Sequence, residues 1–183
     1  MRGRALLFTA WMDKDKNDAA RVMFEQALKI DPNNADALAG EAFTYSNEYR
    51  TNTGIDYDAK ILGLLDRAIA LAPDSVRPYE AKADYLFTAG RGDEAIRTAD
   101  TGLAINPNSA TLYDAKGWPE NVLGRFEQAK SDVLQAMRLS PRDPSIGSWQ
   151  LNLGDAELGL GHFDAAIEAF RKADNGCCGP ASP

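Results

Sequence analysis

The chain is poor in the residues that most often build catalytic and metal sites. Among its 183 residues it has one histidine, His162, and two cysteines, which are neighbours at Cys177 and Cys178. A histidine-based metal site generally needs more than one histidine, and His162 is expected in a solvated turn, so we expect neither such a site nor a Ser-His-Asp triad. Adjacent cysteines lack the two-residue spacer of zinc and thioredoxin-like motifs and form no disulfide framework. We therefore expect no metal, no cofactor and no enzymatic activity, and, with no sign of an oxidising compartment, a cytoplasmic protein.

Long apolar runs are also missing, and acidic residues outnumber basic ones. No run approaches the roughly 18 apolar residues of a membrane-spanning helix. The N-terminal "MRGRALLFTAWMDKDK" is interpreted as a helix, because its short apolar run ends in charges and lacks a small-residue cleavage site. The net charge of -7 disfavours nucleic acid or an anionic membrane as the main partner. The hydrophobic share of 44% is nevertheless sufficient for a packed core.

One phrase occurs four times, as "ALKIDPNNADAL", "AIALAPDSVRPY", "GLAINPNSATLY" and "AMRLSPRDPS". Its prolines are separated by 41, 34 and 34 residues, and the residues five, eight and twelve places before them keep the same register. A fifth copy, Ala166, Phe170 and Ala173, follows without the proline. The prolines are Pro32, Pro73, Pro107 and Pro141; the small residues five places earlier are Ala27, Ala68, Gly102 and Ala136.

Each part of the phrase has a physical role in a pair of helices. Small residues let two helices approach closely. Proline stops a helix because it lacks an amide donor and clashes with the preceding turn. The "NN", "DS" and "NS" that follow are good N-cap types for the next helix. Glycine marks the turn inside each pair, in "TAGRGDEAI", "VLGRFEQAK" and "GLGHFDAAI".

This pattern resembles the tetratricopeptide repeat, a helix-turn-helix unit, over nearly the whole chain. The resemblance implies an all-α fold, a right-handed superhelix of about five repeats within residues 1–175, followed by a flexible tail, 176–183. The surplus residues of the second repeat fall in "SNEYRTNTGIDYDAK". Neither edge carries a polar capping helix, which indicates a segment of a longer protein or ends that dock on another copy as a homodimer. The repeat limits are about 1–34, 35–75, 76–109, 110–143 and 147–180, the last incomplete.

In tetratricopeptide families the first helix of each pair lines a concave groove. The matching positions carry large aromatics, acids and an asparagine, which implies a protein or peptide partner with apolar and basic side chains. Phe43 and Phe87 have an alternative role in packing between first helices, whereas Trp118 is expected to serve binding. A carboxylate clamp, as in chaperone-binding relatives, is not expected, because its places hold Ala5, Thr9, Ala39, Glu80 and Asp84. The groove candidates are Phe43, Glu80, Asp84, Phe87, Asp114, Trp118, Asn121 and Asp155, with Arg2, Asp36 and Arg77 at equivalent positions.

Two single residues need separate interpretation. Pro119 lies inside the expected first helix of the fourth repeat, where a proline costs about 3 kcal/mol and frees the carbonyl of Ala115. A kink beside Trp118 indicates either a ligand site or a tolerated irregularity, and both hypotheses stay open. His162 aligns with Arg91 and Arg125 and is expected to be a solvated turn residue.

The chain also resembles the repeat segments of some bacterial signalling proteins, including class III adenylate or guanylate cyclases. The phrases that carry this resemblance are "RGRALLFTAW", "FEQALKIDPNNADALAGEAFTY" and "RLSPRDPS", together with the lengthened second repeat. It implies a regulatory or assembly module. We expect a non-catalytic interaction scaffold; a ligand-sensing module that regulates an attached effector, such as a nucleotide cyclase, is the alternative.

Overall fold

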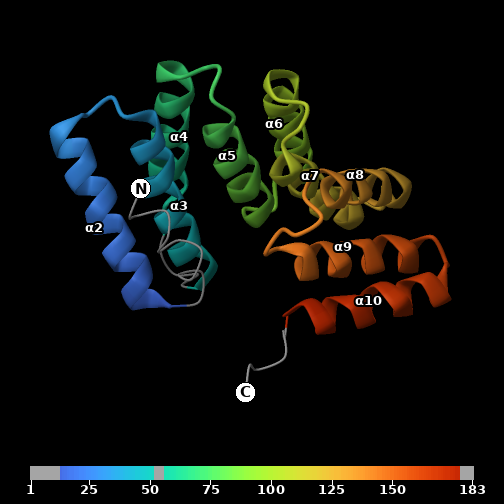
Figure 1. Ribbon diagram of the computed structural model, residues 1–183. Coiled ribbons are helices and arrows are strands. Elements are labelled where there is room, and N and C mark those ends of the chain that lie inside the picture. The colour runs from blue at the N-terminus through green and yellow to red at the C-terminus, as the bar shows by residue number, and fades with distance from the viewer. Residues whose placement is uncertain (1–12, 52–55, 178–183) are drawn as a thin grey trace. The chain divides into compact units, whose positions relative to one another are not determined.

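The computed structural model describes residues 13–51 and 56–177, and over these ranges the chain consists of helices and short connections without a strand (Figure 1). The all-α prediction is therefore confirmed. The first helix expected in repeat one, with Arg2, Ala5 and Thr9, lies outside the described residues, as do Cys178 and most of the expected tail. The described helices are α2 (Lys14–Ile30), α3 (Ala35–Thr51), α4 (Asp58–Leu71), α5 (Val76–Thr88), α6 (Gly92–Ile105), α7 (Ala110–Val122), α8 (Phe126–Leu139), α9 (Ile146–Gly159) and α10 (Phe163–Cys177).

The chain divides into two compact units, residues 1–89 and 90–183. Unit 1 contains α2 to α5, and unit 2 contains α6 to α10. The boundary follows Ala89, in the turn predicted for the third repeat. The prediction that the repeats form one continuous array over residues 1–175 is not tested by this division.

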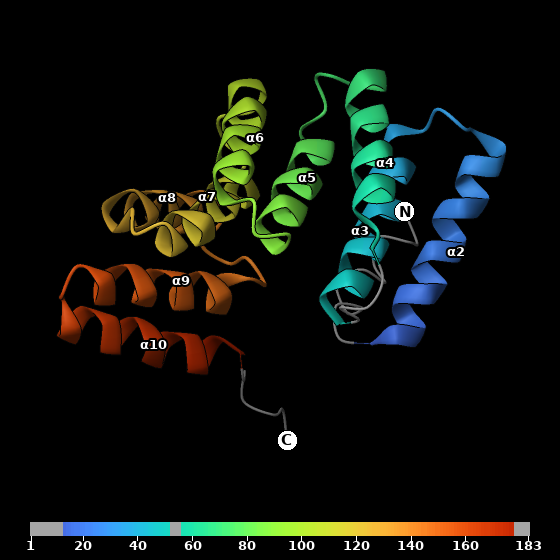
Figure 2. The same ribbon diagram turned by 180° about the vertical axis from the view of Figure 1, so that it is seen from behind.

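In unit 1, α3 packs against α2, α4 and α5 (Figure 2). Its core joins one face of α3 to α4 through side chains that are almost completely buried, including Leu38, Ala42, Ile61 and Leu65. Burying a leucine or isoleucine side chain contributes about 1.5–3 kcal/mol, so these contacts hold the helix pair together.

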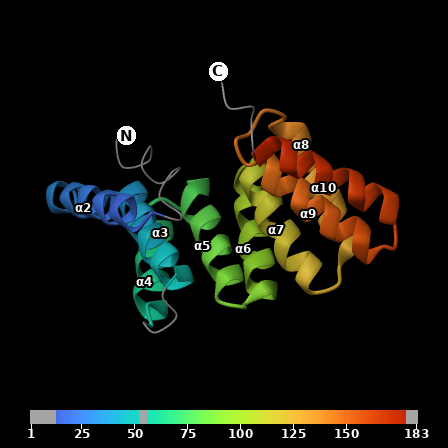
Figure 3. The ribbon, with the colours of Figure 1, turned by 90° about the horizontal axis from the view of Figure 1, so that it is seen from below.

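In unit 2, each helix packs against the next one along the chain, and α7 also packs against α9 (Figure 3). A buried cluster of Val133 and Ala136 from α8 with Trp149 from α9 forms part of its core. This packing brings the first helices of the fourth and fifth repeats, α7 and α9, next to each other.

The recurring phrase ends one helix and begins another, as predicted. α2, α4, α6 and α8 each end two residues before their proline. The amide just after each helix donates to the small residue four positions back, for example Asp31 to Ala27 at 2.8 Å and Asn106 to Gly102 at 2.9 Å. Ala68, Gly102 and Ala136 are buried, and the half-buried Ala27 packs against the Ala20–Phe24 cluster. The small residues therefore face neighbouring helices.

Most of the predicted caps and turns are present. The side chains of Asn34 and Ser109 accept hydrogen bonds from the amides three residues later, at 2.9 Å and 3.3 Å. Ser75, at the equivalent place before α5, makes no such bond. Gly124 has a φ of 74°, a left-handed conformation that glycine adopts without the steric penalty of a side chain.

Candidate partner-binding surfaces

Three of the predicted groove residues of unit 1 form ion pairs across α3 and α5. Arg50 pairs with Asp84 at 2.6 Å and also donates to Thr88. Arg77 lies 3.5 Å from Asp36. These ion pairs join neighbouring first helices and neutralise part of the acidic field expected there. Asp84 therefore already has a basic partner within the chain.

The other three candidates in unit 1 are half-buried. Phe43 and Phe87 each keep part of the ring at the surface, and Glu80 is partly accessible. Half-burial is compatible with either role considered for the two phenylalanines, so their assignment to a groove remains a prediction.

In unit 2 the structure brings two candidates together through a residue that sequence analysis missed. The side-chain amide of Asn121 donates to the backbone carbonyl of Asn152 at 2.8 Å and to its Oδ1 at 2.6 Å. Asn152 in turn donates to Asp114 at 3.4 Å. Because Asn152 is fully buried between α7 and α9, Asp114 and Asn121 help to join these helices. The sequence feature that could have indicated Asn152 is its position as a polar residue within the largely apolar "WQLNLG".

An exposed apolar surface remains on α9. Leu151 and Leu158 are 39% and 49% exposed and flank the exposed Asp155 at spacings of four and three residues, so the three share one helical face. On α7, the half-buried Trp118 lies four residues after Asp114 and three before Asn121, both of which face α9. Trp118 therefore shares their face of the helix. We call Trp118, Leu151, Asp155 and Leu158 the α7–α9 face. Partial desolvation raises the pKa of Asp155 above its usual range.

Unit 1 contains a cluster of charged and aromatic side chains around Tyr45. The Arg21 guanidinium and the Lys60 ammonium lie 4.1 Å and 4.0 Å from the centre of the Tyr45 ring. Glu48 pairs with Arg21 at 2.6 Å and accepts a hydrogen bond from Tyr57 at 2.9 Å. Cation–π contacts contribute about 0.5–2 kcal/mol each. These groups satisfy one another, so the cluster stabilises the packing of α2, α3 and α4.

His162 is an exposed turn residue, as expected, but it has a specific partner. Its Nδ1 lies 2.8 Å from Oε2 of Glu157, a buried carboxyl that also pairs with Lys130 at 3.0 Å. Burial alone raises the pKa of Glu157, but the bonds to His162 and Lys130 outweigh it and hold that pKa below its usual range. The arrangement anchors the turn between α9 and α10 to α8.

A second set of charges lies where α6, α7 and α8 meet. The Lys116 ammonium on α7 lies 3.0 Å from Asp100 on α6 and 2.9 Å from Asp132 on α8. Burial lowers the pKa of Lys116, but the bonds to the two aspartates raise it above its usual range on balance. Glu120, one turn further along α7, is also buried. Neither Lys116 nor Glu120 was predicted from the sequence to belong to a site.

The described residues contain neither a candidate metal-binding group nor a candidate membrane-spanning helix. In residues 13–51 and 56–177, no group of three or more histidine, cysteine or acidic side chains is placed to hold a metal ion. Within the same ranges, no helix is long and apolar enough to cross a membrane.

Comparisons with known proteins agree with the fold. Tetratricopeptide-repeat family models match residues 122–182 and 12–34. A thermophilic TPR protein of Thermus thermophilus superposes with a TM-score of 0.74 at 22% identity, covering 90% of this chain and 85% of that one. For PilF of Pseudomonas aeruginosa the TM-score is 0.69 at 20% identity, with coverages of 95% and 76%.

Curated relatives match only in part. The STIP1 homolog of Dictyostelium discoideum is 33% identical over 106 residues, which is 58% of this chain and 17% of that protein. The chain thus spans less than a quarter of the length of the first curated relatives it matches. The repeats predicted from the proline register, the helices that they form and the matching family models agree: residues 12–34 and 122–182 match tetratricopeptide repeats, and the described residues have an all-α fold of paired helices.

Proposed function

We propose that this chain is a non-catalytic scaffold that binds a protein segment on the first-helix surface of its repeats. Tetratricopeptide repeat proteins mediate protein–protein interactions. The observation that carries the proposal is the α7–α9 face. Exposed Leu151 and Leu158 flank Asp155 on α9, and the half-buried Trp118 shares a face of α7 with Asp114 and Asn121. Apolar and aromatic anchors around a partly desolvated charge are typical of interface hot spots.

The chemistry of this face favours a partner with apolar and basic side chains. The leucines and Trp118 offer apolar contact, and a Lys or Arg would pair with Asp155. Partial desolvation strengthens such a pair because the local dielectric constant is lower than in water. The net charge of -7 adds long-range attraction for a basic segment.

A wider context follows from the resemblance to bacterial signalling proteins. We propose a regulatory or assembly module within such a protein, acting in the cytoplasm. The alternative is a ligand-sensing module that regulates an attached effector such as a nucleotide cyclase, which requires an enclosed pocket beside Trp118. The pocket between α7 and α8 does not include Trp118. The exposed leucines of the α7–α9 face favour the binding scaffold.

Self-association is a further part of the proposal. On α10, Phe163 and Ile167 are 64% and 48% exposed and lie four residues apart on one face. A homodimer that covers this pair is expected to weaken when Ile167 becomes lysine. Sedimentation equilibrium of the parent and Ile167→Lys chains tests this, and a parent chain that stays monomeric at all concentrations removes the dimer.

The groove proposal is tested with peptides selected for binding to the whole chain from a random display library. Fluorescence anisotropy then measures their affinity for Leu158→Ala, Asp155→Asn and Leu134→Ala. Leu134, on α8, is exposed to a similar extent, 44%, and serves as the matched control. We expect Leu158→Ala to weaken binding about tenfold, the effect of losing roughly 1.4 kcal/mol, and Leu134→Ala to change it less than twofold.

Two results would count against this assignment. Equal losses for Leu158→Ala and Leu134→Ala would place the peptide elsewhere. Selected peptides without basic residues, bound equally by Asp155→Asn and the parent, would remove the electrostatic part of the proposal.

A further inference from the structure

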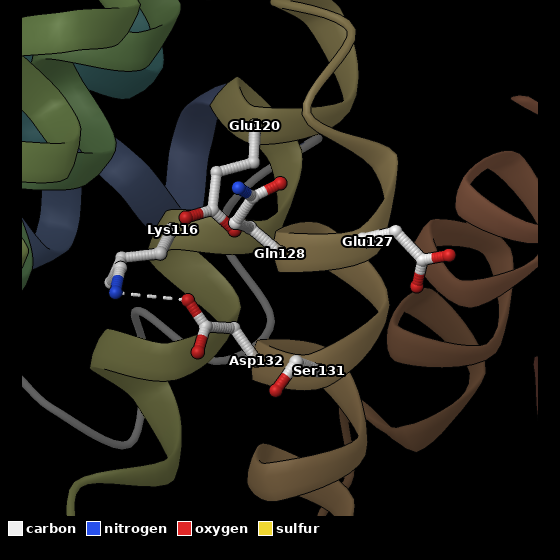
Figure 4. A pocket seen from close by; sticks show the side chains of 6 residues that line it. All are labelled: Lys116, Glu120, Glu127, Gln128, Ser131 and Asp132. Carbon is white, nitrogen blue, oxygen red and sulfur yellow. Dashed lines mark ion pairs between the residues drawn. The ribbon is translucent and has the colours of Figure 1, made fainter.

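A polar pocket of about 340 Å³ opens between α7 and α8 in unit 2. Successive residues of an α-helix are about 100° apart, so Glu120 points roughly opposite to Trp118 and the pocket lies on the other side of α7 from the α7–α9 face. Its volume is near the lower end of the roughly 300–1,000 Å³ of small-molecule pockets, which suits one side chain. The lining residues are Lys116, Glu120, Glu127, Gln128, Ser131 and Asp132 (Figure 4).

The charges of this pocket are not balanced. Lys116 is its one lining cation, and two aspartates already match that charge at 2.9 Å and 3.0 Å. Among the described residues, neither Glu120 nor Glu127 forms an ion pair within 4 Å, although the charge of Lys116 also acts on Glu120. The lining is therefore acidic in excess of what the chain itself neutralises.

Glu120 is a buried carboxyl that interacts with Asp132 and keeps one oxygen unpaired. It is 4% exposed, and its Oε2 atom is buried without a hydrogen-bond partner in the described structure. A buried polar atom without a partner costs free energy and is uncommon in folded proteins. Burial and the neighbouring charge of Asp132 raise the pKa of Glu120 to about 8, so in the absence of a partner the carboxyl holds a proton at neutral pH. The carboxyl is directed into the space between α7 and α8, near Gln128 and Lys116 (Figure 4).

We propose that this pocket, the Glu120 pocket, binds the guanidinium group of an arginine side chain from a protein partner, with Glu120 and Asp132 as its acceptors. A guanidinium presents five N–H donors in a plane and is weakly hydrated, so it enters a partly buried site more readily than an ammonium. Gln128 and Ser131 add acceptor oxygens near the opening. In the part of the chain that the structure describes, no group of three or more histidine, cysteine or acidic side chains is placed to hold a metal ion.

Binding is coupled to the protonation of Glu120. The incoming cation stabilises the carboxylate, so each arginine bound displaces the proton of Glu120 into solvent. The other titratable groups that act on Glu120 are Asp132 on α8, Lys116 on α7 and Asp100 on α6. We expect the affinity to increase as the pH rises from 6 towards 8.

The test is a titration of the whole chain with N-acetyl-arginine amide, followed by ¹H–¹⁵N correlation spectra. N-acetyl-citrulline amide, which has the same shape without the charge, is the ligand control. We expect the arginine compound to shift the amide signals of residues 116–132, and Glu120→Gln to weaken its binding about tenfold and remove the pH dependence. Glu127→Gln, at the exposed rim, should weaken binding about two- to threefold, and Glu168→Gln on α10 should leave it unchanged.

Several outcomes overturn the proposal. The pocket is excluded if the citrulline compound binds equally well, if Glu120→Gln keeps the parent affinity with an unchanged circular dichroism spectrum, or if no signal of residues 116–132 shifts. Loss of binding in Asp155→Asn instead would place arginine on the α7–α9 face, which supports the groove and refutes the pocket. Free arginine binding about tenfold more tightly than the blocked form would identify a free amino acid as the ligand.

Discussion

Replacing glycine by alanine at two helical positions is expected to change stability in opposite directions. A β-carbon on Gly117 of α7 would lie 2.6 Å from Nδ2 of Asn152 and 2.6 Å from a methyl group of Val133. Both neighbours are fully buried. A β-carbon on Gly63 of α4 would meet nothing within 4 Å.

The expected magnitudes follow from two effects. Alanine favours the helical state by about 1 kcal/mol relative to glycine, and this gain applies at both positions. Overpacking a dense core costs about 1–3 kcal/mol, and this penalty applies only at Gly117, where Asn152 is held by Asn121 and cannot move freely. We expect Gly63→Ala to raise the free energy of unfolding by about 1 kcal/mol and Gly117→Ala to lower it by about 1 kcal/mol.

Urea denaturation followed by far-ultraviolet circular dichroism measures both changes. The two glycines belong to different compact units, and each variant is compared with the parent chain under the same conditions. Two shifts of the same sign would refute the argument, since the substitution is chemically identical and only the tertiary surroundings differ. An unchanged midpoint for Gly117→Ala would show that α7, α8 and α9 pack less closely than described.

Three other substitutions give independent checks. Leu65→Ala, at a side chain that is 1% exposed, should lower the free energy of unfolding by about 2–5 kcal/mol, whereas Leu134→Ala should change it by less than about 0.5 kcal/mol; comparable urea midpoints for the two would contradict the core assignment. The pKa of Glu120 is raised from its ordinary 4.5 to about 8, so its contribution to stability is complete below pH 4.5 and lost as the pH rises towards 8. Urea titrations at pH 5, 7 and 9 should show that the free energy of unfolding declines with pH, and that Glu120→Gln reduces this decline. Parallel declines for the parent and the variant would argue against this role of Glu120. Pro119→Ala restores a helical amide, which stabilises the fold by about 3 kcal/mol, but it removes two buried methylenes and makes the unfolded chain more flexible, which together cost about 2 kcal/mol. A higher midpoint of thermal unfolding would mean that the kink is only tolerated. An unchanged or lower midpoint would speak against stored strain at this position.

The positions of helix ends and turns were predictable from the sequence because their causes are local. At the four recurring positions, a proline without an amide to donate follows the last helical residue by two places, whereas Pro119 lies inside α7. Gly124 supplies a positive φ within its own residue. The recurring small residues, such as Ala68 and Ala136, are buried because their spacing places them on the face that meets the next helix.

The sequence did not predict which polar residues form hydrogen bonds and ion pairs with each other between helices. The sequence placed Asp114 and Asn121 on one face of α7, but not the buried Asn152, 31 residues after Asn121, that binds both. Asp84 was expected to be available to a partner, and Arg50, 34 residues earlier in the chain, occupies it.

The sequence by itself therefore determined the repeat, the helix boundaries and the faces on which side chains lie, since each depends on backbone chemistry within a few residues. The tertiary structure decided which charges are neutralised and which, like Glu120 and Asp155, are left in partly dry surroundings. That outcome depends on ångström-scale distances between separate helices, and periodicity along one helix does not specify those distances.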